Sequence, residues 1–139
     1  MVSEGKFIVA SGPVIIENGK VLVTKDSKDP FYKLPGGTVK EGESLEEGCI
    51  RRAKEEINAN VEIVSPLRPN ILYENPKTKE KMTIILINYL SKLKNKKEIK
   101  PIPPNQEIKW MSLADIKNGG GNVSPNVREL IKKEFENLK

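Results

Sequence analysis

The sequence has 139 residues, of which 37% are hydrophobic and 31% charged, a composition typical of one globular domain over residues 1–139. No stretch approaches the roughly 18 consecutive apolar residues of a membrane-spanning helix, and the single cysteine, Cys49, has no internal partner, so we expect a cytoplasmic protein without membrane contact. Histidine is absent, which excludes zinc sites of the His/Cys type and leaves a carboxylate to act as any general base.

The net charge of +5 raises the question of nucleic-acid binding, and lysines gather between Ser91 and Lys100. That segment has no interleaved aromatic residue that could stack on bases, and it follows a predicted strand. The pattern therefore favours the solvated end of a hairpin over a nucleic-acid surface.

The predicted elements begin with a β-hairpin. Strands are expected over 7–16 and 21–24, joined at Asn18-Gly19, a dipeptide that readily takes the positive φ angles of a tight turn. A loop follows and ends at Pro35-Gly36-Gly37, where the backbone is free to bend sharply and to approach a ligand closely.

A helix is predicted after Ser44, because the Ser44 hydroxyl can cap it while Glu47, three residues further on, bonds back to the amide of Ser44. Its expected buried stripe, at helical spacing, consists of Cys49, Ile50, Ala53 and Ile57. Later elements are strands over 61–64, 70–74, 82–90 and 107–113, a short helix over 113–117, and a final helix that Ser124 and Pro125 begin. The order indicates an α/β protein with one mixed sheet.

The charged stretch from Arg51 to Glu56 has two interpretations. At about 100° per residue, Arg52, Glu55 and Glu56 fall within one sector of the predicted helix, away from its buried stripe. In one interpretation Arg51 pairs with Glu55 and Arg52 with Glu56 on a solvated face. In the other, the two glutamates hold a hard divalent cation, Mg²⁺ or Mn²⁺, with a carbonyl of the glycine turn. The helix alone leaves both open.

The spacing around this stretch resembles the signature of the Nudix hydrolases. Gly37 is followed after five residues by Glu43 and after seven more by Arg51, and Ala53, Glu55, Glu56 and Ala59 continue the family's order. The preceding "LPGG" and the later "EIKWMSLADI" fit the same family. The match covers most of the chain at fixed spacing, which makes it far stronger than a single motif.

The resemblance implies a Nudix-type α/β/α sandwich with a central mixed β-sheet. It also implies a pyrophosphohydrolase that uses Mg²⁺ or Mn²⁺ to cleave a nucleoside diphosphate linked to another group, with ADP-ribose or a related nucleotide as the expected substrate. By position, Glu55 and Glu56 are implied as catalytic metal ligands, and the carbonyl of Gly36 or Gly37 as a further ligand. Glu43 and Arg51 are implied to brace the loop against the helix.

Two positions depart from the signature: Arg52 stands where it has a glutamate, and Asn58 where it has a glycine. Asparagine tolerates the left-handed conformation, so Arg52 is the more serious change. The site could keep Glu55 and Glu56 and take its general base from a distant loop. Glu107 is the candidate for that base, and it fits equally well as a solvated carboxylate at the end of a strand. Alternatively, Arg52 binds the substrate's phosphates directly, or the chain has lost catalysis and binds a nucleotide with Arg52 in place of the cation.

Phe31 and Tyr32, in the loop before the glycines, and Tyr73 further on are candidates for stacking on a nucleobase, and each also fits ordinary packing around a loop. The expected partner is a small-molecule nucleotide. Hydrolysis of oxidised or non-standard nucleoside triphosphates is a further alternative. A homodimer is an arrangement open to a protein of this size.

Overall fold

The computed structural model describes residues 6–135, and its elements follow the predicted order. The strands are β1 (Phe7–Glu17), β2 (Lys20–Asp26), β3 (Gly37–Thr38), β4 (Val61–Pro66), β5 (Asn70–Glu74), β6 (Lys81–Leu93) and β7 (Gln106–Ser112). The helices are α1 (Leu45–Ile57), α2 (Leu113–Lys117) and α3 (Pro125–Glu134), with a single 3₁₀ turn, η1, at Lys96–Glu98. Within the described residues no helix is long and apolar enough to cross a membrane.

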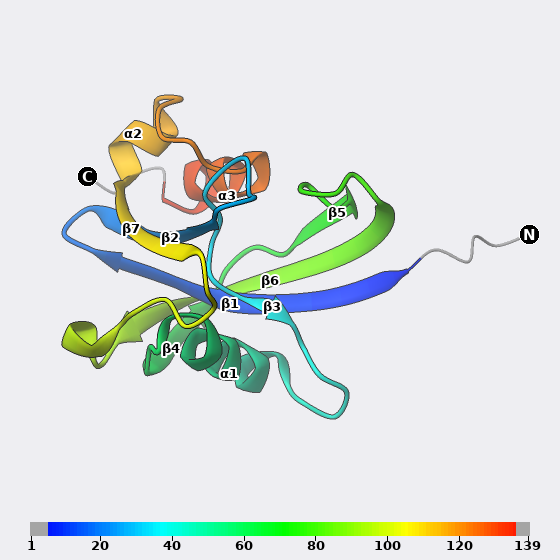
Figure 1. Ribbon diagram of the computed structural model, residues 1–139, viewed down its shortest axis with the longest axis horizontal. Helices are drawn as coiled ribbons and strands as arrows, with labels where there is room; N and C mark the ends of the chain where they lie inside the picture. Colours follow the sequence, from blue (N-terminus) through cyan, green and yellow to red (C-terminus); the bar gives the residue numbers. More distant parts are fainter. Residues whose placement is uncertain (1–5, 136–139) are drawn as a thin grey trace, which may run out of the picture.

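The strands form one mixed sheet in which β1 and β6 run parallel at the centre (Figure 1). The hydrogen-bonded order is β4-β6-β1-β2-β7, with β3 added to β1 and β5 added to β6. All strand pairs other than β1 with β6 are antiparallel. β6 can lie between three other strands because its sequence, "MTIILINYL", supplies apolar side chains to both faces of the sheet.

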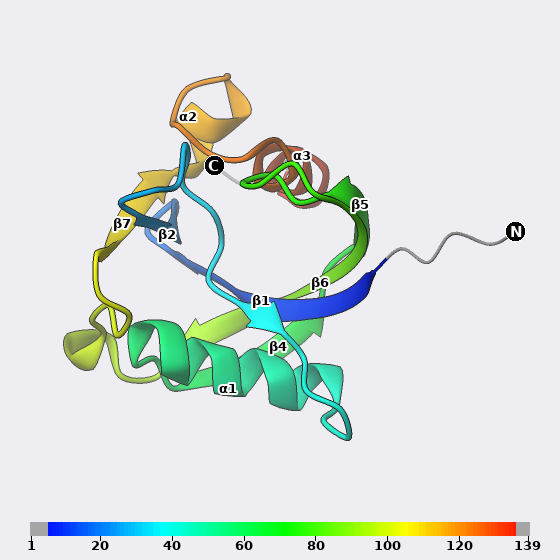
Figure 2. The same ribbon diagram turned by 45° about the vertical axis from the view of Figure 1, so that its right-hand side comes forward.

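Helices cover both faces of the sheet, so the molecule has the α/β/α layering that the resemblance implied. Figure 2 shows α1 on one side and α2 with α3 on the other. The core under α1 contains Ile15, Leu22, Ala53, Ile57, Ala59 and Val61. The larger core toward α2 and α3 includes Val14, Val21, Val23, Ile116, Val127 and Ile131. Alternate residues of β1 thus serve opposite cores, as the two-residue period of a strand requires.

Two details differ from the predictions. Ile50, which was assigned to the buried stripe of α1, is 45% exposed, because the stripe needs only Cys49, Ala53 and Ile57 to fill the space above the sheet. The lysine-rich segment after Ser91 does not close a hairpin: β6 continues to Leu93 and then enters η1.

Candidate active site

The glycine-rich loop lies directly on the central strand of the sheet. β3 pairs with β1 through Ala10 with Thr38 and Ser11 with Gly37. A Cβ atom on Gly12 would fall 2.0 Å from the Pro35 carbonyl oxygen, and Gly36 has a φ of +143°, so both positions need glycine. This contact fixes β3 at the start of the path into α1.

The start and end of α1 are capped as its sequence predicts. The Ser44 hydroxyl accepts a hydrogen bond from the Glu47 amide, and the Glu47 carboxylate accepts one from the Ser44 amide. At the other end Asn58 takes the left-handed conformation with a φ of 55°, the conformation that a glycine adopts without strain. Asn58 therefore ends α1 in the conformation for which the family signature has a glycine.

Arg51 joins the helix to the loop before it. Its Nε donates to Glu43 Oε2 at 2.7 Å, and its Nη2 donates to Glu43 Oε1 and to the Thr38 carbonyl, both at 3.0 Å. Its Nη1 donates to Glu55 at 2.8 Å. Hydrogen bonds from Arg51 are the main reason that the pKa of Glu43 falls to about 2 and that the pKa of Glu55 also falls.

Arg52 lies against Gly37 of β3 and also bonds to both the helix and the glycine loop. Its Nη1 donates to Glu55 at 3.1 Å, and its Nη2 donates to Glu56 at 3.1 Å and to the Gly36 carbonyl at 3.3 Å. Glu55 Oε1 therefore accepts from both arginines. The first interpretation of the charged stretch, with i,i+4 pairs from Arg51 to Glu55 and from Arg52 to Glu56, describes these contacts.

Glu56 is the more enclosed of the two helix glutamates. It is 8% exposed, and besides Arg52 it lies 3.4 Å from the side-chain amide of Gln106 on β7. The side chain of Glu55, in contrast, is 45% exposed. The two carboxylates thus differ in environment although they are neighbours in the sequence.

The arrangement of these oxygens does not fit a bound divalent cation. Glu55, Glu56 and the Gly36 carbonyl, three of the ligands that the resemblance implied, all accept hydrogen bonds from Arg52. Nowhere in residues 6–135 do three or more acidic or cysteine side chains form a group able to hold a metal ion. The guanidinium takes up the donor set that Mg²⁺ or Mn²⁺ would need.

A cavity of about 310 Å³ lies on the other side of the loop from this cluster. Gly36, Gly37 and Thr38 form one wall. The remaining walls come from β1, the loop around Phe31, β5 with its connection to β6, β6 and the start of α3. Their residues include Ile8, Ala10, Asp29, Leu72, Pro76, Lys77, Ile84, Leu86, Asn88, Ser124, Asn126 and Val127. Segments distant in sequence thus build one pocket beside β3.

Several polar groups in this wall are buried. The side chain of Asp29 is 2% exposed and pairs with Lys33 at 2.7 Å and with Lys77 at 3.2 Å. Asn88 donates to the Gly12 carbonyl at 3.3 Å, and the buried Ser124 hydroxyl has no hydrogen-bond partner among the described residues. The cavity therefore combines apolar walls with a few fixed polar groups, the usual make-up of a small-molecule site.

The two aromatic residues predicted to bind substrate, Phe31 and Tyr32, lie in different places. Phe31 lines the cavity, whereas the Tyr32 ring lies under Lys109, with 5.4 Å from Nζ to the ring centroid, and packs against the core on the α3 side. Glu107 lies beside Tyr32: burial and a hydrogen bond with Glu107 raise the pKa of the Tyr32 hydroxyl.

Sequence reasoning singled out Glu107 and missed its neighbour Gln106. Successive side chains of a strand leave opposite faces, and Ile108 and Trp110 pack into the core under α1. Gln106 is therefore on the α1 face and reaches Glu56, while Glu107 is on the other face. Counting two residues at a time back from Trp110 identifies Gln106 from the sequence.

The fold and the site define a class of protein: an α/β/α sandwich whose glycine loop lies between a charged helix and a cavity of about 310 Å³. The NUDIX domain model matches residues 6–131, and the chain belongs to this family. Nudix hydrolases act on phosphoanhydride bonds and generally use divalent metal ions.

Similar proteins agree with this assignment. A putative 8-oxo-dGTP diphosphatase of Bacillus subtilis (strain 168) is 24% identical over 93% of this chain and 89% of its own. The crystal structure of a MutT protein from Methanosarcina mazei Go1 superposes with a TM-score of 0.77 and 24% identity, over 99% of this chain and 100% of that one. The crystal structure of a Caenorhabditis elegans Ap4A hydrolase superposes with a TM-score of 0.73 and 24% identity, over 94% of this chain and 97% of that one.

Proposed function

We propose that the chain is a pyrophosphohydrolase that cleaves a nucleoside diphosphate linked to another group, with ADP-ribose or a related nucleotide as the first candidate substrate. The observation that carries the proposal is a shared wall. Gly36, Gly37 and Thr38 line the cavity, while the carbonyls of Gly36 and Thr38 accept hydrogen bonds from Arg52 and Arg51. A nucleotide in the cavity would carry its phosphates toward this wall.

The cavity suits the nucleoside part of such a substrate. Its volume of about 310 Å³ is at the lower end of the range for small-molecule sites, enough for one nucleoside but not for a whole dinucleotide. Phe31 offers a ring for stacking, and Asn126 and Asn88 offer amide groups to the edge of a base. The second group of the substrate would extend past β3 into solvent.

Water then attacks one phosphorus and displaces the phosphate of the other half. Because histidine is absent, a carboxylate accepts the proton of this water, and Glu56 is the first candidate, since it is buried and shares the Arg52 guanidinium with the Gly36 carbonyl of the wall. Arg51 and Glu43 hold the loop against α1. Glu107 remains a second candidate base, from its place beside Tyr32. The predicted cofactor, Mg²⁺ or Mn²⁺, would neutralise charge on the substrate's phosphates if it arrived bound to them, since Arg52 occupies the oxygens of Glu55, Glu56 and Gly36.

A second substrate class is favoured by one relative. The Bacillus subtilis protein is named as a putative 8-oxo-dGTP diphosphatase, so oxidised nucleoside triphosphates belong in any substrate test of this chain. A purine base would occupy the same cavity in either case.

The test is a phosphate-release screen with ADP-ribose, diadenosine polyphosphates, nucleotide sugars and 8-oxo-dGTP, run with Mg²⁺, with Mn²⁺ and with chelator. We expect turnover of at least one substrate by the unchanged chain and its loss in Glu56→Gln. Glu107→Gln, assayed in parallel, tests the other base. Absence of turnover across the panel by a folded protein would contradict the proposal.

The contacts of Arg52 favour one further candidate function, a nucleotide-binding protein without catalysis. All three of its acceptors are oxygens that the resemblance implied as metal ligands. Calorimetry separates the two functions: nucleotide binding without turnover supports the binding protein, and turnover excludes it.

A further inference from the structure

Arg52 holds the centre of the charged cluster. Its guanidinium bonds to two carboxylates of α1, Glu55 and Glu56, and to the carbonyl of Gly36 in the loop before β3. A single cation thus connects the helix to the loop through three oxygen atoms. This is the connection that a divalent ion with the same ligands would make.

The guanidinium is packed in place. Only 27% of its side chain is exposed, and its Nε is buried with no hydrogen-bond partner among the described residues. A Cβ atom added to Gly37 would lie 2.5 Å from Nε and 2.6 Å from Nη2. The guanidinium therefore lies directly against the backbone of Gly37. Any side chain at position 37 would clash with it.

The formal charges show what this arginine replaces. Two arginines, Arg51 and Arg52, face three glutamates, Glu43, Glu55 and Glu56, so the cluster has a formal charge of −1. A glutamate at position 52 would make it −3, and one divalent cation would return it to −1. In charge, Arg52 is equivalent to a glutamate together with its metal ion.

We infer that Arg52 is a tethered cation that takes the place of a resident divalent metal ion at the carboxylates of α1. The site is neutralised and the loop is held to the helix without metal. A divalent ion could enter only after Arg52 gave up its three acceptors, and the displaced guanidinium would still repel it at close range. This inference concerns the resident cation and stands independently of turnover.

The test is a Mn²⁺ titration of the full chain, followed by calorimetry and by the electron paramagnetic resonance of free Mn²⁺. The variants are Arg52→Glu, which restores a carboxylate at the site, and Lys54→Glu, which changes the net charge equally from an exposed position two residues further along α1. We expect Arg52→Glu to bind one Mn²⁺ at least about 100-fold more tightly than the unchanged chain. Lys54→Glu should match the unchanged chain.

Thermal unfolding gives a second measurement. Mn²⁺ should raise the melting temperature of Arg52→Glu and leave that of the unchanged chain within error, because a ligand stabilises only the protein that binds it. One saturable Mn²⁺ in the unchanged chain, lost in Glu56→Gln, would overturn the inference. So would equal affinities in Arg52→Glu and Lys54→Glu. If Arg52→Glu does not fold, the unchanged chain decides: absence of a Glu56-dependent site supports the inference, and its presence refutes it.

Discussion

Arg52 and Glu56 form an ion pair at 3.1 Å in which the same Nη2 atom also donates to the Gly36 carbonyl. Because Gly36 lines the cavity and Glu56 is a buried residue of α1, this pair connects the pocket to the helix. The neighbouring arginine, Arg51, makes the parallel connection from α1 to Glu43 and Thr38.

Loss of the Arg51 connection should destabilise the fold. We expect Arg51→Gln to lower the free energy of unfolding by about 1 kcal/mol, since the pair with Glu43 is bidentate but partly solvated. Arg51→Lys should recover only part, because an ammonium cannot reproduce the fork of a guanidinium. Urea denaturation measures both. Arg68→Gln, which removes an exposed pair at 3.7 Å to Glu134, is the control and should change stability much less.

Glu43 should make the stability depend on acid pH. Its pKa is about 2 in the folded chain against an ordinary value of 4.5, so its contribution is complete above about pH 4.5 and is lost as the pH falls toward 2. In Glu43→Gln this part of the pH dependence should disappear from urea midpoints measured between pH 2 and 6. The exposed Glu41→Gln should keep it, and an unchanged profile in Glu43→Gln would contradict the assignment.

The close contact between Gly12 and Pro35 predicts a steep cost for any side chain at position 12. Gly12→Ala should destabilise by about 3 kcal/mol or more, because both partners are backbone and neither can rotate away. Gly42→Ala is the comparison: its φ of +83° costs about 1 kcal/mol, but the space around it is open. Thermal unfolding should rank the two variants in this order, and equal losses would show that the loop moves freely.

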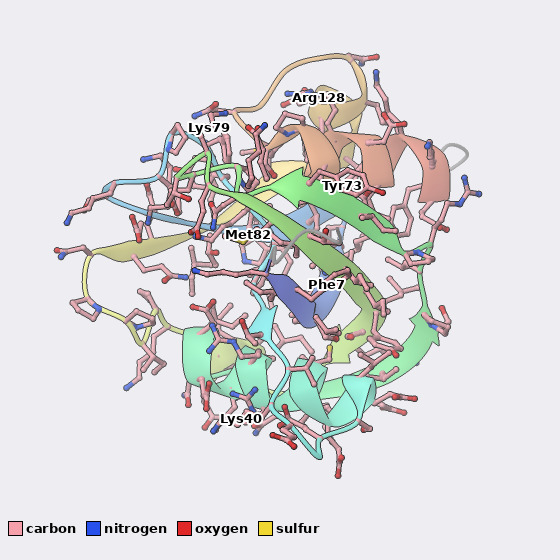
Figure 3. All side chains as sticks on the ribbon, turned by 90° about the vertical axis from the view of Figure 1, so that its right-hand side faces the viewer. Phe7, Lys40, Tyr73, Lys79, Met82 and Arg128 are labelled. Atoms are coloured by element: carbon pink, nitrogen blue, oxygen red, sulfur yellow. The ribbon has the colours of Figure 1, made fainter. Side chains whose placement is uncertain are left out.

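Phe31 should contribute to nucleotide affinity and Tyr73 should not. We expect Phe31→Ala to weaken nucleotide binding roughly tenfold through lost stacking in the cavity. Tyr73 on β5 (Figure 3) is 70% exposed and is not among the cavity-lining residues, so it provides a matched aromatic outside the cavity. Calorimetric titration of both alanine variants distinguishes them, and an equal effect would place the nucleotide elsewhere.

Cys49 should be inert in the folded chain. It is a fully buried residue of α1, and burial raises the pKa of its thiol to about 12, so almost no thiolate exists at pH 8. A thiol reagent such as dithionitrobenzoate should react only after denaturant is added. Rapid reaction of the native chain would mean that α1 opens away from the sheet.

Local patterns in the sequence predicted most of the fold. The caps of α1, the Asn18-Gly19 turn and the strand positions depend on residues close together in the chain, so spacing identifies them. Local patterns could not predict the parallel pairing of β1 with β6, because the paired residues, such as Phe7 and Thr83, lie 76 positions apart in the chain. Ile50 was assigned wrongly since helical period alone does not say how wide a stripe the sheet will cover.

Part of the candidate site could be predicted from the sequence and part could not. The contact of Arg51 with Glu43 is one that the family resemblance implied from their positions in the signature. The cavity could not be predicted from the sequence, since its walls come from five separate segments. The position of the Arg52 guanidinium could not be predicted either, because it depends on the close approach to the backbone of Gly37. The cytoplasmic location and the homodimer remain predictions.

The position of a bound nucleotide tests the account most directly. A crystal structure with a non-hydrolysable analogue of ADP-ribose and Mn²⁺ should show the nucleobase in the cavity beside Phe31 and the phosphates against Gly37. The guanidinium of Arg52 should still bridge Glu55, Glu56 and Gly36. A nucleobase outside the cavity, or a manganese ion between Glu55 and Glu56 with Arg52 turned away, would contradict it.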